Sequence, residues 1–258
     1  MMSPPRARQS TASVCLRLES LSKRFAGLDA VSEITLGVAR GERRAIIGPN
    51  GAGKTTLFNL ISGELAPSAG RILLYGEDVT DLPPNRRAAL GISRTFQITN
   101  LFPKLTVLEN LVLAAQALAR TKFNMLRPVR RFTPLYAKAE ALLQDIGLRD
   151  RRDDQVRNLS HGEQRQIEVA MALLSDPHLL LLDEPAAGLA PAEATVMVSL
   201  LKALDPEISV LIIEHDMDVA FEVADRIAVL NSGRLLAEGT KAEIRANQAV
   251  REIYFGGR

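Results

Sequence analysis

The residues whose types and spacing could do chemistry begin with a glycine-rich segment that ends in a lysine and two threonines. Residues 48–55 read Gly-Pro-Asn-Gly-Ala-Gly-Lys-Thr and match the pattern G-x-x-x-x-G-K-[ST] in full. Glycines let successive backbone N–H groups turn toward phosphate oxygens, and a following helix adds partial positive charge at its start. An apolar segment ending at Ile47 precedes the pattern, and a helical stretch at Thr56–Ser62 follows it. We therefore expect a nucleotide-phosphate site formed by Gly48, Pro49, Asn50, Gly51, Ala52, Gly53, Lys54, Thr55 and Thr56.

Two side chains at the end of this segment have separate tasks. The Lys54 ammonium suits the β- and γ-phosphates, and the Thr55 hydroxyl suits Mg²⁺. The alternative interpretation is a glycine-rich turn that binds no nucleotide. That alternative leaves the lysine, the threonine and the flanking strand and helix unexplained.

A pair of acids follows a second apolar segment. Asp183 and Glu184 come directly after Leu179–Leu182, and open α/β sheets bind ligands at the carboxyl ends of their strands. Asp183 is suited to the Mg²⁺ shell, directly or through water, and Glu184 to orienting and deprotonating an attacking water. Taken alone, the pair would be interpreted as two solvated acids at a strand end. Beside a phosphate loop, we interpret it as catalytic.

The elements that must position these side chains alternate between strands and helices. Short apolar runs, rather than strict alternation, predict strands that are covered on both faces. Helical periodicity and capping boxes that begin at Thr106 and Thr240 predict helices, among them Thr106–Arg120 and Pro134–Ile146. The predicted strands are Val14–Leu21, Ile34–Val38, Arg43–Ile47, Arg71–Tyr75, Leu179–Leu182, Val210–Ile213, Arg226–Leu230 and Arg234–Ala237.

This alternation predicts an α/β fold. We expect a P-loop NTPase core with a largely parallel sheet, an antiparallel β edge and an inserted helical subdomain. Residues 1–13 are expected to be a disordered tail, residues 14–96 and 159–258 the α/β core, and residues 97–158 the helical subdomain.

Composition excludes several classes of protein. Lys and Arg number 32 against 30 Asp and Glu, and the net charge of +2 is too small to indicate wholesale nucleic-acid binding. The single cysteine, Cys15, rules out an internal disulfide framework, and the scattered histidines lack metal-ligand spacing. The apolar stretches fall far short of the roughly 18 residues that cross a bilayer. No secretory signal is recognisable at residues 1–13, and we expect the protein to stay in the cytoplasm.

A basic run lies between the two helices expected in the middle of the chain. We interpret the run as a solvated surface, and contact with lipid headgroups or an acidic partner is the second interpretation. Its members, with no acid between them, are Arg120, Lys122, Arg127, Arg130 and Arg131.

A third segment points to a family. Residues 159–166 read Leu-Ser-His-Gly-Glu-Gln-Arg-Gln and open a helix that runs to about Leu174. The chain carries, in this order, a phosphate loop, a glutamine, this segment, an Asp-Glu pair and a histidine. In this order of motifs it resembles the ATP-binding subunits of ABC transporters, whose signature is LSGGQ. The resemblance implies ATP and Mg²⁺ as cofactors. It also implies ATP hydrolysis in a dimer, with ATP enclosed between one subunit's phosphate loop and its partner's signature.

The resemblance implies roles for five further residues. Phe25 matches the aromatic that stacks on adenine, with a core position as the alternative. Gln97 matches the glutamine that senses Mg²⁺ and links the sheet to the helical subdomain. His215 matches the switch histidine at the γ-phosphate, although a lone histidine is more often structural. Ser160 and Gly162 match the signature residues that contact the γ-phosphate.

Three positions depart from the family's pattern. His161 replaces the first glycine of the signature, and Glu163 replaces its glutamine. A negative Glu163 near phosphate would be unfavourable unless its side chain points away. Ala190 stands where the family usually has aspartate, which puts the usual hydrogen bonding between subunits in doubt there.

Shorter runs narrow the resemblance within the family. Residues 94–97, 105–110, 185–189, 213–217 and 253–256 are similar to the larger ATP-binding subunit of branched-chain amino acid importers. Urea and short-chain amide importers and lipopolysaccharide-export ATPases are close alternatives. The implied partners are a second ATP-binding subunit (the same or a related chain), transmembrane permeases and, indirectly, a periplasmic substrate-binding protein, with no nucleic acid. The implied location is peripheral, on the cytoplasmic face of the inner membrane.

Two other functional classes compete with a transport ATPase. The first is a soluble ABC-type ATPase that acts on ribosomes or DNA. Ribosome-acting members usually carry two such domains and DNA-repair relatives insert long coiled coils, and this chain of 258 residues shows neither. The second is a P-loop kinase of small molecules, which would need neither residues 160–162 nor the Asp-Glu strand.

Overall fold

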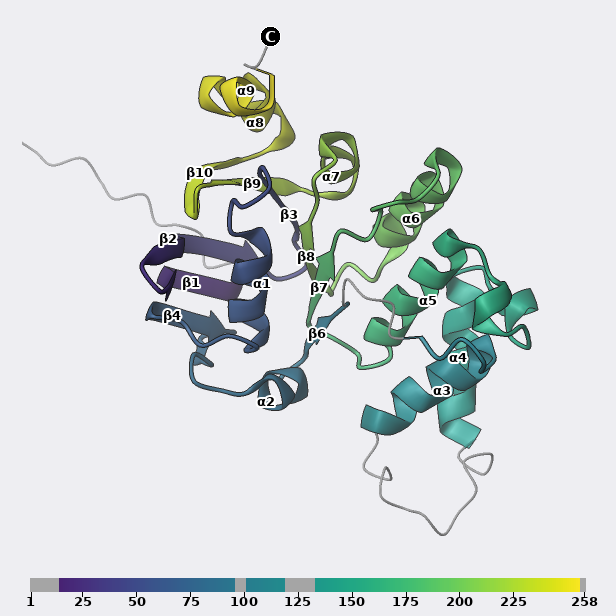
Figure 1. Cartoon of the computed structure of the whole chain (residues 1–258). Coiled ribbons are helices and arrows are strands. Elements are labelled where there is room, and N and C mark those ends of the chain that lie inside the picture. The colour runs from purple at the N-terminus through teal and green to yellow at the C-terminus, as the bar shows by residue number, and fades with distance from the viewer. Residues whose placement is uncertain (1–13, 96–100, 119–132, 256–258) are drawn as a thin grey trace, which may run out of the picture.

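Two β-sheets with helices around them make up the computed structural model, which describes residues 14–95, 101–118 and 133–255 (Figure 1). The strands are β1 Val14–Phe25, β2 Leu28–Ala39, β3 Arg43–Ile47, β4 Ala69–Leu74, β5 Glu77–Asp78, β6 Ile92–Arg94, β7 Leu179–Asp183, β8 Ser209–Ile213, β9 Arg226–Asn231 and β10 Arg234–Gly239. The helices are α1 Lys54–Ser62, α2 Pro84–Ala89, α3 Val107–Leu118, α4 Thr133–Asp145, α5 His161–Leu173, α6 Pro191–Ala203, α7 Met217–Val223, α8 Lys241–Ala246 and α9 Gln248–Phe255.

The larger sheet is parallel except at one edge. Its order is β10-β9-β3-β8-β7-β6, in which β3, β6, β7, β8 and β9 pair in parallel and β10 pairs antiparallel to β9. The smaller sheet, in the order β2-β1-β4-β5, is antiparallel throughout. The mixed α/β fold with a largely parallel sheet and an antiparallel edge is therefore confirmed.

Both faces of the larger sheet are buried. On β7, Leu179 and Leu181 pack into a core shared with α1 and the smaller sheet. Leu180 and Leu182 point to the opposite face and pack with α5, α6 and α7. Because neither face of the strand meets water, the sequence shows a continuous apolar run there instead of alternation.

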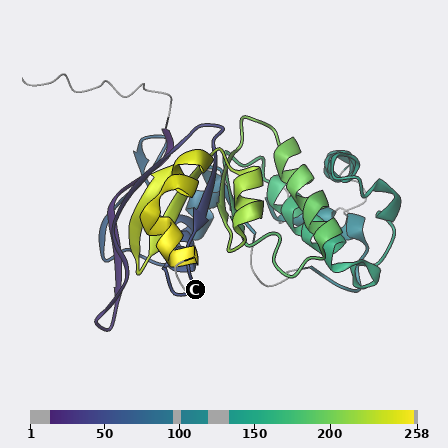
Figure 2. The ribbon, with the colours of Figure 1, turned by 90° about the horizontal axis from the view of Figure 1, so that it is seen from above.

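Helices α3, α4 and α5 share a hydrophobic cluster of their own, which includes Val107, Leu111, Leu143 and Ile167. Figures 1 and 2 both show these helices on the side of the larger sheet away from β1 and β2. The far end of α5 also packs on the sheet through Val169. The helix that begins next to Ser160 thus connects the helical group to the core.

The strands expected from the sequence all form, with shifted ends. Strand β1 continues past Leu21 to Phe25 and β2 begins at Leu28, so these two strands make one long hairpin. The sequence analysis missed β5 and β6, which have only two and three residues. Cys15 is buried. The predicted tail, the basic run 120–131 and Gln97 lie outside the described residues.

None of the helices in the described ranges is long and apolar enough to cross a membrane.

A buried arginine stabilises the end of α1, the helix that follows the phosphate loop. The Arg87 side chain is 1% exposed. Its guanidinium donates hydrogen bonds to the carbonyl oxygens of Leu60 and Ile61 in the last turn of α1, at 2.6 and 2.8 Å, and to those of Thr80 and Leu82. Burial lowers the pKa of Arg87. One cation therefore satisfies carbonyls that the helix end leaves open.

We predict that Arg87→Ala lowers the free energy of unfolding by about 3 kcal/mol, because each buried carbonyl left without a donor costs about 1–3 kcal/mol. Urea unfolding followed by circular dichroism measures this. The control is Arg86→Ala, since Arg86 is an exposed neighbour on the same helix and its loss should change stability by less than about 0.5 kcal/mol. Equal losses in the two variants would contradict the role given to Arg87.

Candidate nucleotide site

Three neighbouring parallel strands bring the predicted residues to one edge of the larger sheet. Strand β3 ends at Ile47 and leads into the glycine-rich loop. In the parallel register, Ile213 at the end of β8 pairs with Ile46 on one side and with Asp183 on the other. The loop 48–53, the acids after β7 and the residues after β8 therefore meet at the carboxyl ends of adjacent strands.

Two glycines of the loop are required by close backbone contacts. Gly53 has φ +97°, and a Cβ there would lie 2.4 Å from the carbonyl oxygen of Ala30. A Cβ on Gly48 would lie 2.3 Å from the carbonyl oxygen of Leu230. Helix α1 begins directly after Gly53, so the first-turn N–H groups of Lys54, Thr55 and Thr56 are available to an anion.

Lys54 is held inside the loop. Its side chain is buried, and Nζ donates hydrogen bonds to the carbonyl oxygens of Gly48 at 2.7 Å and Pro49 at 3.2 Å. Burial lowers the pKa of Lys54, and the nearby charges of Glu184 and Asp183 oppose that shift. An ammonium has three N–H donors, so one remains for a phosphate oxygen.

Asp183 is paired with an arginine that the sequence analysis did not assign. Arg94 Nη2 on β6 donates to Asp183 Oδ2 at 3.1 Å, and Nη1 donates to Asn59 Oδ1 on α1 at 2.6 Å. The Asp183 side chain is fully buried. Because one guanidinium binds both groups, the carboxylate has a fixed place relative to the helix of the phosphate loop.

The oxygens at this edge fit Mg²⁺. The Thr55 residue is exposed at the start of α1, and Asp183 contributes a carboxylate whose charge reaches Lys54. Mg²⁺ prefers hard oxygen ligands, keeps several waters and is commonly held by one or two protein groups together with substrate phosphates. Among the described residues no group of three or more His, Cys, Asp and Glu is placed to hold a metal alone. This donor set therefore suits Mg²⁺ that arrives with a nucleotide.

Glu184 occupies a backbone conformation that non-glycine residues rarely adopt, with φ +49°. Its N–H donates to the carbonyl oxygen of Ile213 at 3.0 Å. Its Oε2 lies 3.7 Å from Nδ1 of His215, whose side chain is more than half exposed. Strained backbone of this kind persists only where the surroundings hold it, and it is common at functional sites. Glu184 and His215 are thus brought together, as the sequence predicts.

Glu214 is a third acid at this edge, and sequence reasoning missed it. It is 1% exposed, one carboxyl oxygen accepts the Ala186 N–H at 3.3 Å, and the other has no hydrogen-bond partner among the described residues. Burial is the main cause that raises the pKa of Glu214 to about 7, and the charges of Glu184 and Asp216 add to it. Its position between an apolar strand and His215 was the available signal.

Ser160 and Gly162 lie at the start of α5, where several carboxylates gather. Ser160 is the N-cap residue, and its side-chain oxygen accepts the Glu163 N–H at 3.2 Å. The Glu163 carboxylate accepts the Ser160 N–H at 2.8 Å and pairs with Arg151 at 3.2 Å. The negative charge of Glu163 is therefore compensated at the start of its own helix. The Gly162 N–H donates to Glu193 on α6 at 3.1 Å, a contact the sequence analysis did not foresee.

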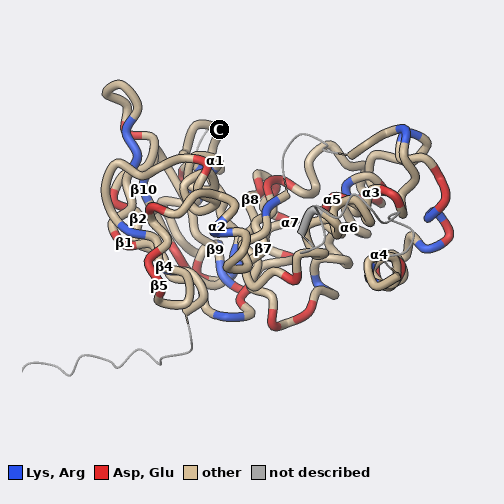
Figure 3. Tube along the Cα trace, turned by 90° about the horizontal axis from the view of Figure 1, so that it is seen from below, with Lys and Arg blue, Asp and Glu red and all other residues tan. Residues whose placement is uncertain are grey.

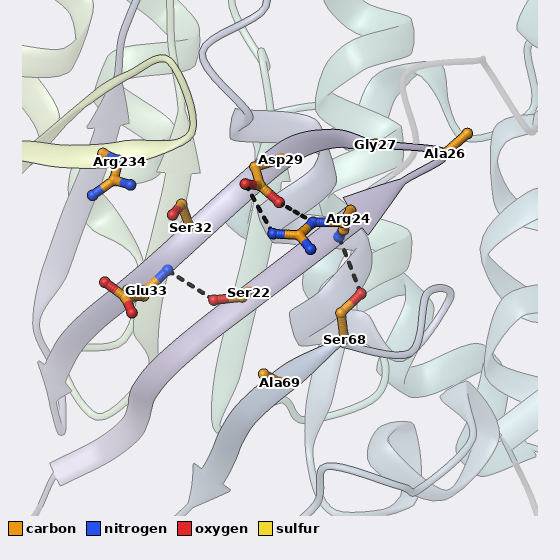
Figure 4. A pocket seen from close by; sticks show the side chains of 10 residues that line it. All are labelled: Ser22, Arg24, Ala26, Gly27, Asp29, Ser32, Glu33, Ser68, Ala69 and Arg234. Atoms are coloured by element: carbon orange, nitrogen blue, oxygen red, sulfur yellow. Dashed lines mark hydrogen bonds and ion pairs between the residues drawn. The ribbon is translucent and has the colours of Figure 1, made fainter.

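Phe25 stands at the tip of the β1–β2 hairpin. Its side chain is 41% exposed, with the Lys23 ammonium 5.1 Å from the ring centre. Next to it, Arg24 and Asp29 pair across the two strands at 2.6 and 3.2 Å (Figure 4). The Arg24 hydrogen bond lowers the pKa of Asp29. The exposed ring is accessible for stacking on a flat base, and the core alternative is wrong.

The hairpin also borders a pocket of about 730 Å³. Figure 4 shows its lining side chains drawn from β1, β2, β4 and β10. The lining combines Arg24 and Arg234 with Asp29 and Glu33, so charges of both signs are present. Figure 3 shows the same mixture on a larger scale, with basic and acidic segments in both halves of the molecule.

Comparison with known proteins decides the family. The model of the family described as ABC transporter matches residues 31–187, more than half of the chain. The chain belongs to the ABC transporter family. A second model, described as branched-chain amino acid ATP-binding cassette transporter, matches residues 234–258 of this ABC subunit.

Relatives and solved structures cover nearly all of this ABC subunit. LivG of Escherichia coli strain K12, a high-affinity branched-chain amino acid transport ATP-binding protein, is 40% identical over 93% of this chain and 97% of its own. BraF of Pseudomonas aeruginosa, with the same description, is 38% identical over the same shares. The crystal structure of a nucleotide-free ATP-binding cassette from an ABC transporter matches with a TM-score of 0.84, 32% identity and coverage of 94% and 99%. This ABC subunit is accordingly an ATP-binding protein and an ATP hydrolase.

We predict that Glu214→Gln changes how the stability of this ABC subunit depends on pH. The pKa is about 7 in the folded chain against an ordinary value of 4.5, so between these values the folded state keeps a proton that the unfolded state has lost. The wild-type free energy of unfolding therefore falls as pH rises from 4.5 to 7. The Gln variant lacks this loss and should gain up to about 3 kcal/mol relative to wild type between pH 5 and pH 8.

Urea unfolding of both proteins at four pH values across this range measures the difference. The Gln side chain retains an oxygen for the Ala186 N–H, so the hydrogen bond is preserved. Parallel stability curves for the two proteins would show that Glu214 is not a proton-binding group of the folded state.

Proposed function

We propose that this chain is the larger ATP-binding subunit of an importer for branched-chain amino acids. The observation that carries the proposal is the 40% identity to LivG over almost the whole of both chains. The C-terminal model described for branched-chain amino acid cassettes, which matches residues 234–258, supports the same substrate class independently.

A lipopolysaccharide exporter is the second candidate. LptB of Haemophilus influenzae, a lipopolysaccharide export system ATP-binding protein, is 33% identical over 93% of this chain and 97% of its own. Its identity is lower than that of LivG and BraF, and the C-terminal match bears the description of amino acid transporters. Both observations favour import of branched-chain amino acids.

Their positions support the following roles for the core residues, and the role of Gln97 rests on the sequence resemblance alone. The N–H groups of loop 48–53 and of the first turn of α1, with the Lys54 ammonium, hold the β- and γ-phosphates. Glu184 holds and deprotonates the attacking water, and His215, 3.7 Å from it, contacts the γ-phosphate and orients the pair. Thr55 and Asp183 would hold Mg²⁺, with Gln97 as a further ligand, and Mg²⁺ when bound neutralises phosphate charge.

The signature residues act on a second subunit's ATP. Ser160 and Gly162 belong to the group of helices α3, α4 and α5, which lies on the far side of the sheet from β1 and β2. A relative with a TM-score of 0.73 and 26% identity, covering 87% of this chain and 98% of its own, was solved as a dimer in a post-hydrolysis state with ADP and Pi. We infer that ATP is enclosed between the phosphate loop of one subunit and Ser160 and Gly162 of the other.

The adenine contact, the domains, the location and the partners complete the proposal. Phe25 stacks on the adenine from the hairpin tip. Residues 14–96 and 159–258 act as the α/β core and residues 97–158 as a helical subdomain that contacts the permeases. The chain works at the cytoplasmic face of the inner membrane. Its partners are a second ATP-binding subunit and the permeases, which receive substrate from a periplasmic binding protein.

We predict that Glu184→Gln lowers ATP turnover by about a hundredfold or more, because a general base contributes that much, while ATP binding persists. Phosphate release and binding of a fluorescent ATP analogue measure the two quantities. The control is Glu77→Gln, which removes an exposed acid on β5 and should leave both unchanged. ATP hydrolysis at the wild-type rate by the Glu184 variant would show that Glu184 is not the general base.

Transport itself tests the substrate class. Proteoliposomes that contain the purified chain, its second ATP-binding subunit and the permeases are given ATP inside and labelled leucine with its binding protein outside. We expect ATP-dependent leucine uptake, which Lys54→Ala abolishes. ATP-driven movement of urea or lipopolysaccharide, without leucine uptake in the corresponding assembly, would overturn the proposal.

A further inference from the structure

The carboxylate of Glu193 binds the N–H of Gly162, one of the two residues that the proposed function assigns to the γ-phosphate. Oε1 accepts the Gly162 N–H at 3.1 Å, and Oε2 accepts the Ala190 N–H at 3.2 Å. A side-chain hydrogen bond with Ser160 is the largest cause that lowers the pKa of Glu193, followed by those from Ala190 and Gly162. Oε1 of Glu193 therefore occupies the Gly162 N–H of the signature.

The contact between Gly162 and Glu193 is close, and a larger residue at position 162 would push this flexible side chain aside. A Cβ at position 162 would lie 2.8 Å from the carboxyl carbon and from Oε1 of Glu193. The carboxylate is thus seated closely against the start of α5, where the helix dipole and open N–H groups favour an anion. A phosphate on the same donors would meet a like charge within contact distance, and two anions cannot share that place at low cost.

We propose that Glu193 is an internal substitute for the γ-phosphate, which occupies the signature in the isolated subunit and is displaced by ATP on the second subunit. The inference rests on the proposed function, because it takes Ser160 and Gly162 as the contacts of that ATP. It adds a competitor within this chain, so that part of the ATP affinity of the dimer is used to remove Glu193 from the signature.

Displacement also has a consequence for the chain's own catalytic edge. When Glu193 leaves the signature, the bond that joins it to the Ala190 N–H is strained or lost. Ala190 ends the segment 185–190, which begins directly after Glu184. The arrival of ATP at the signature of one subunit is thereby transmitted to the segment beside its own Glu184.

The test uses Glu193→Gln in a Glu184→Gln background, where ATP is bound and not split. Gln keeps the size and one oxygen acceptor but removes the charge. We expect the ATP concentration that gives half-maximal dimer to fall at least about fivefold, measured by light scattering for the chain alone and mixed with its second ATP-binding subunit. ATP binding to the monomer, measured at low protein concentration, should stay unchanged because Glu193 acts at the signature and not at the phosphate loop.

The matched control is Glu243→Gln in the same background. Glu243 occupies the equivalent place in α8, where its carboxylate accepts the Thr240 N–H at 2.6 Å. That variant should need the same ATP concentration as Glu184→Gln alone. An unchanged or higher ATP requirement in the Glu193 variant would overturn the inference and leave the proposed function standing. Failure of every variant to pair with either partner in ATP would overturn the proposed function, and this inference with it.

Discussion

Parallel pairing among β3, β7 and β8 is the constraint on which the nucleotide site depends. Because Ile213 is in register with both Ile46 and Asp183, the ends of three strands are aligned to within one residue. Burial of both faces fixes that register, since a slip by one residue would exchange every side chain between two different hydrophobic clusters. The hydrophobic effect on the strands thus sets the distances among loop 48–53, Glu184 and His215.

Two buried ions at this edge, Asp183 and Lys54, each have specific partners. Asp183 is held by Arg94, which also binds α1 through Asn59. Lys54 is held by carbonyl oxygens of its own loop. Removing one member of a buried pair costs about 3–5 kcal/mol, so the pairs keep the acid and the ammonium in place without a nucleotide. Glu184, by contrast, is placed by its left-handed backbone conformation and by the hydrogen bond from its N–H to the Ile213 carbonyl oxygen.

The central residues of the nucleotide site were predictable because the sequence patterns that mark them are local. The phosphate loop, the acids after β7 and His215 each adjoin an apolar strand, so the sequence order alone places them at one sheet edge. Arg94, Glu214 and Glu193 were missed because their partners are distant in sequence, at positions 183, 186 and 162. No local pattern distinguishes Arg94 and Glu193 from surface charges, whereas Glu214 directly follows the apolar strand β8 and could have been found from that position. Strands β5 and β6 were missed for a related reason, since two or three residues carry no periodicity.

Glu163 and Ala190, two of the three departures from the family's pattern, lie at the starts of α5 and α6. Glu163 replaces a neutral glutamine, yet its charge is compensated by the Ser160 N–H and Arg151. Ala190 has no side-chain acceptor to cap α6, and Glu193, three residues further on, accepts the Ala190 N–H as the acid of a capping box does. Because Glu193 reaches Gly162 with its other oxygen, one carboxylate joins the starts of α5 and α6. A change in the place of the Glu193 carboxylate therefore affects N–H groups at both helix starts.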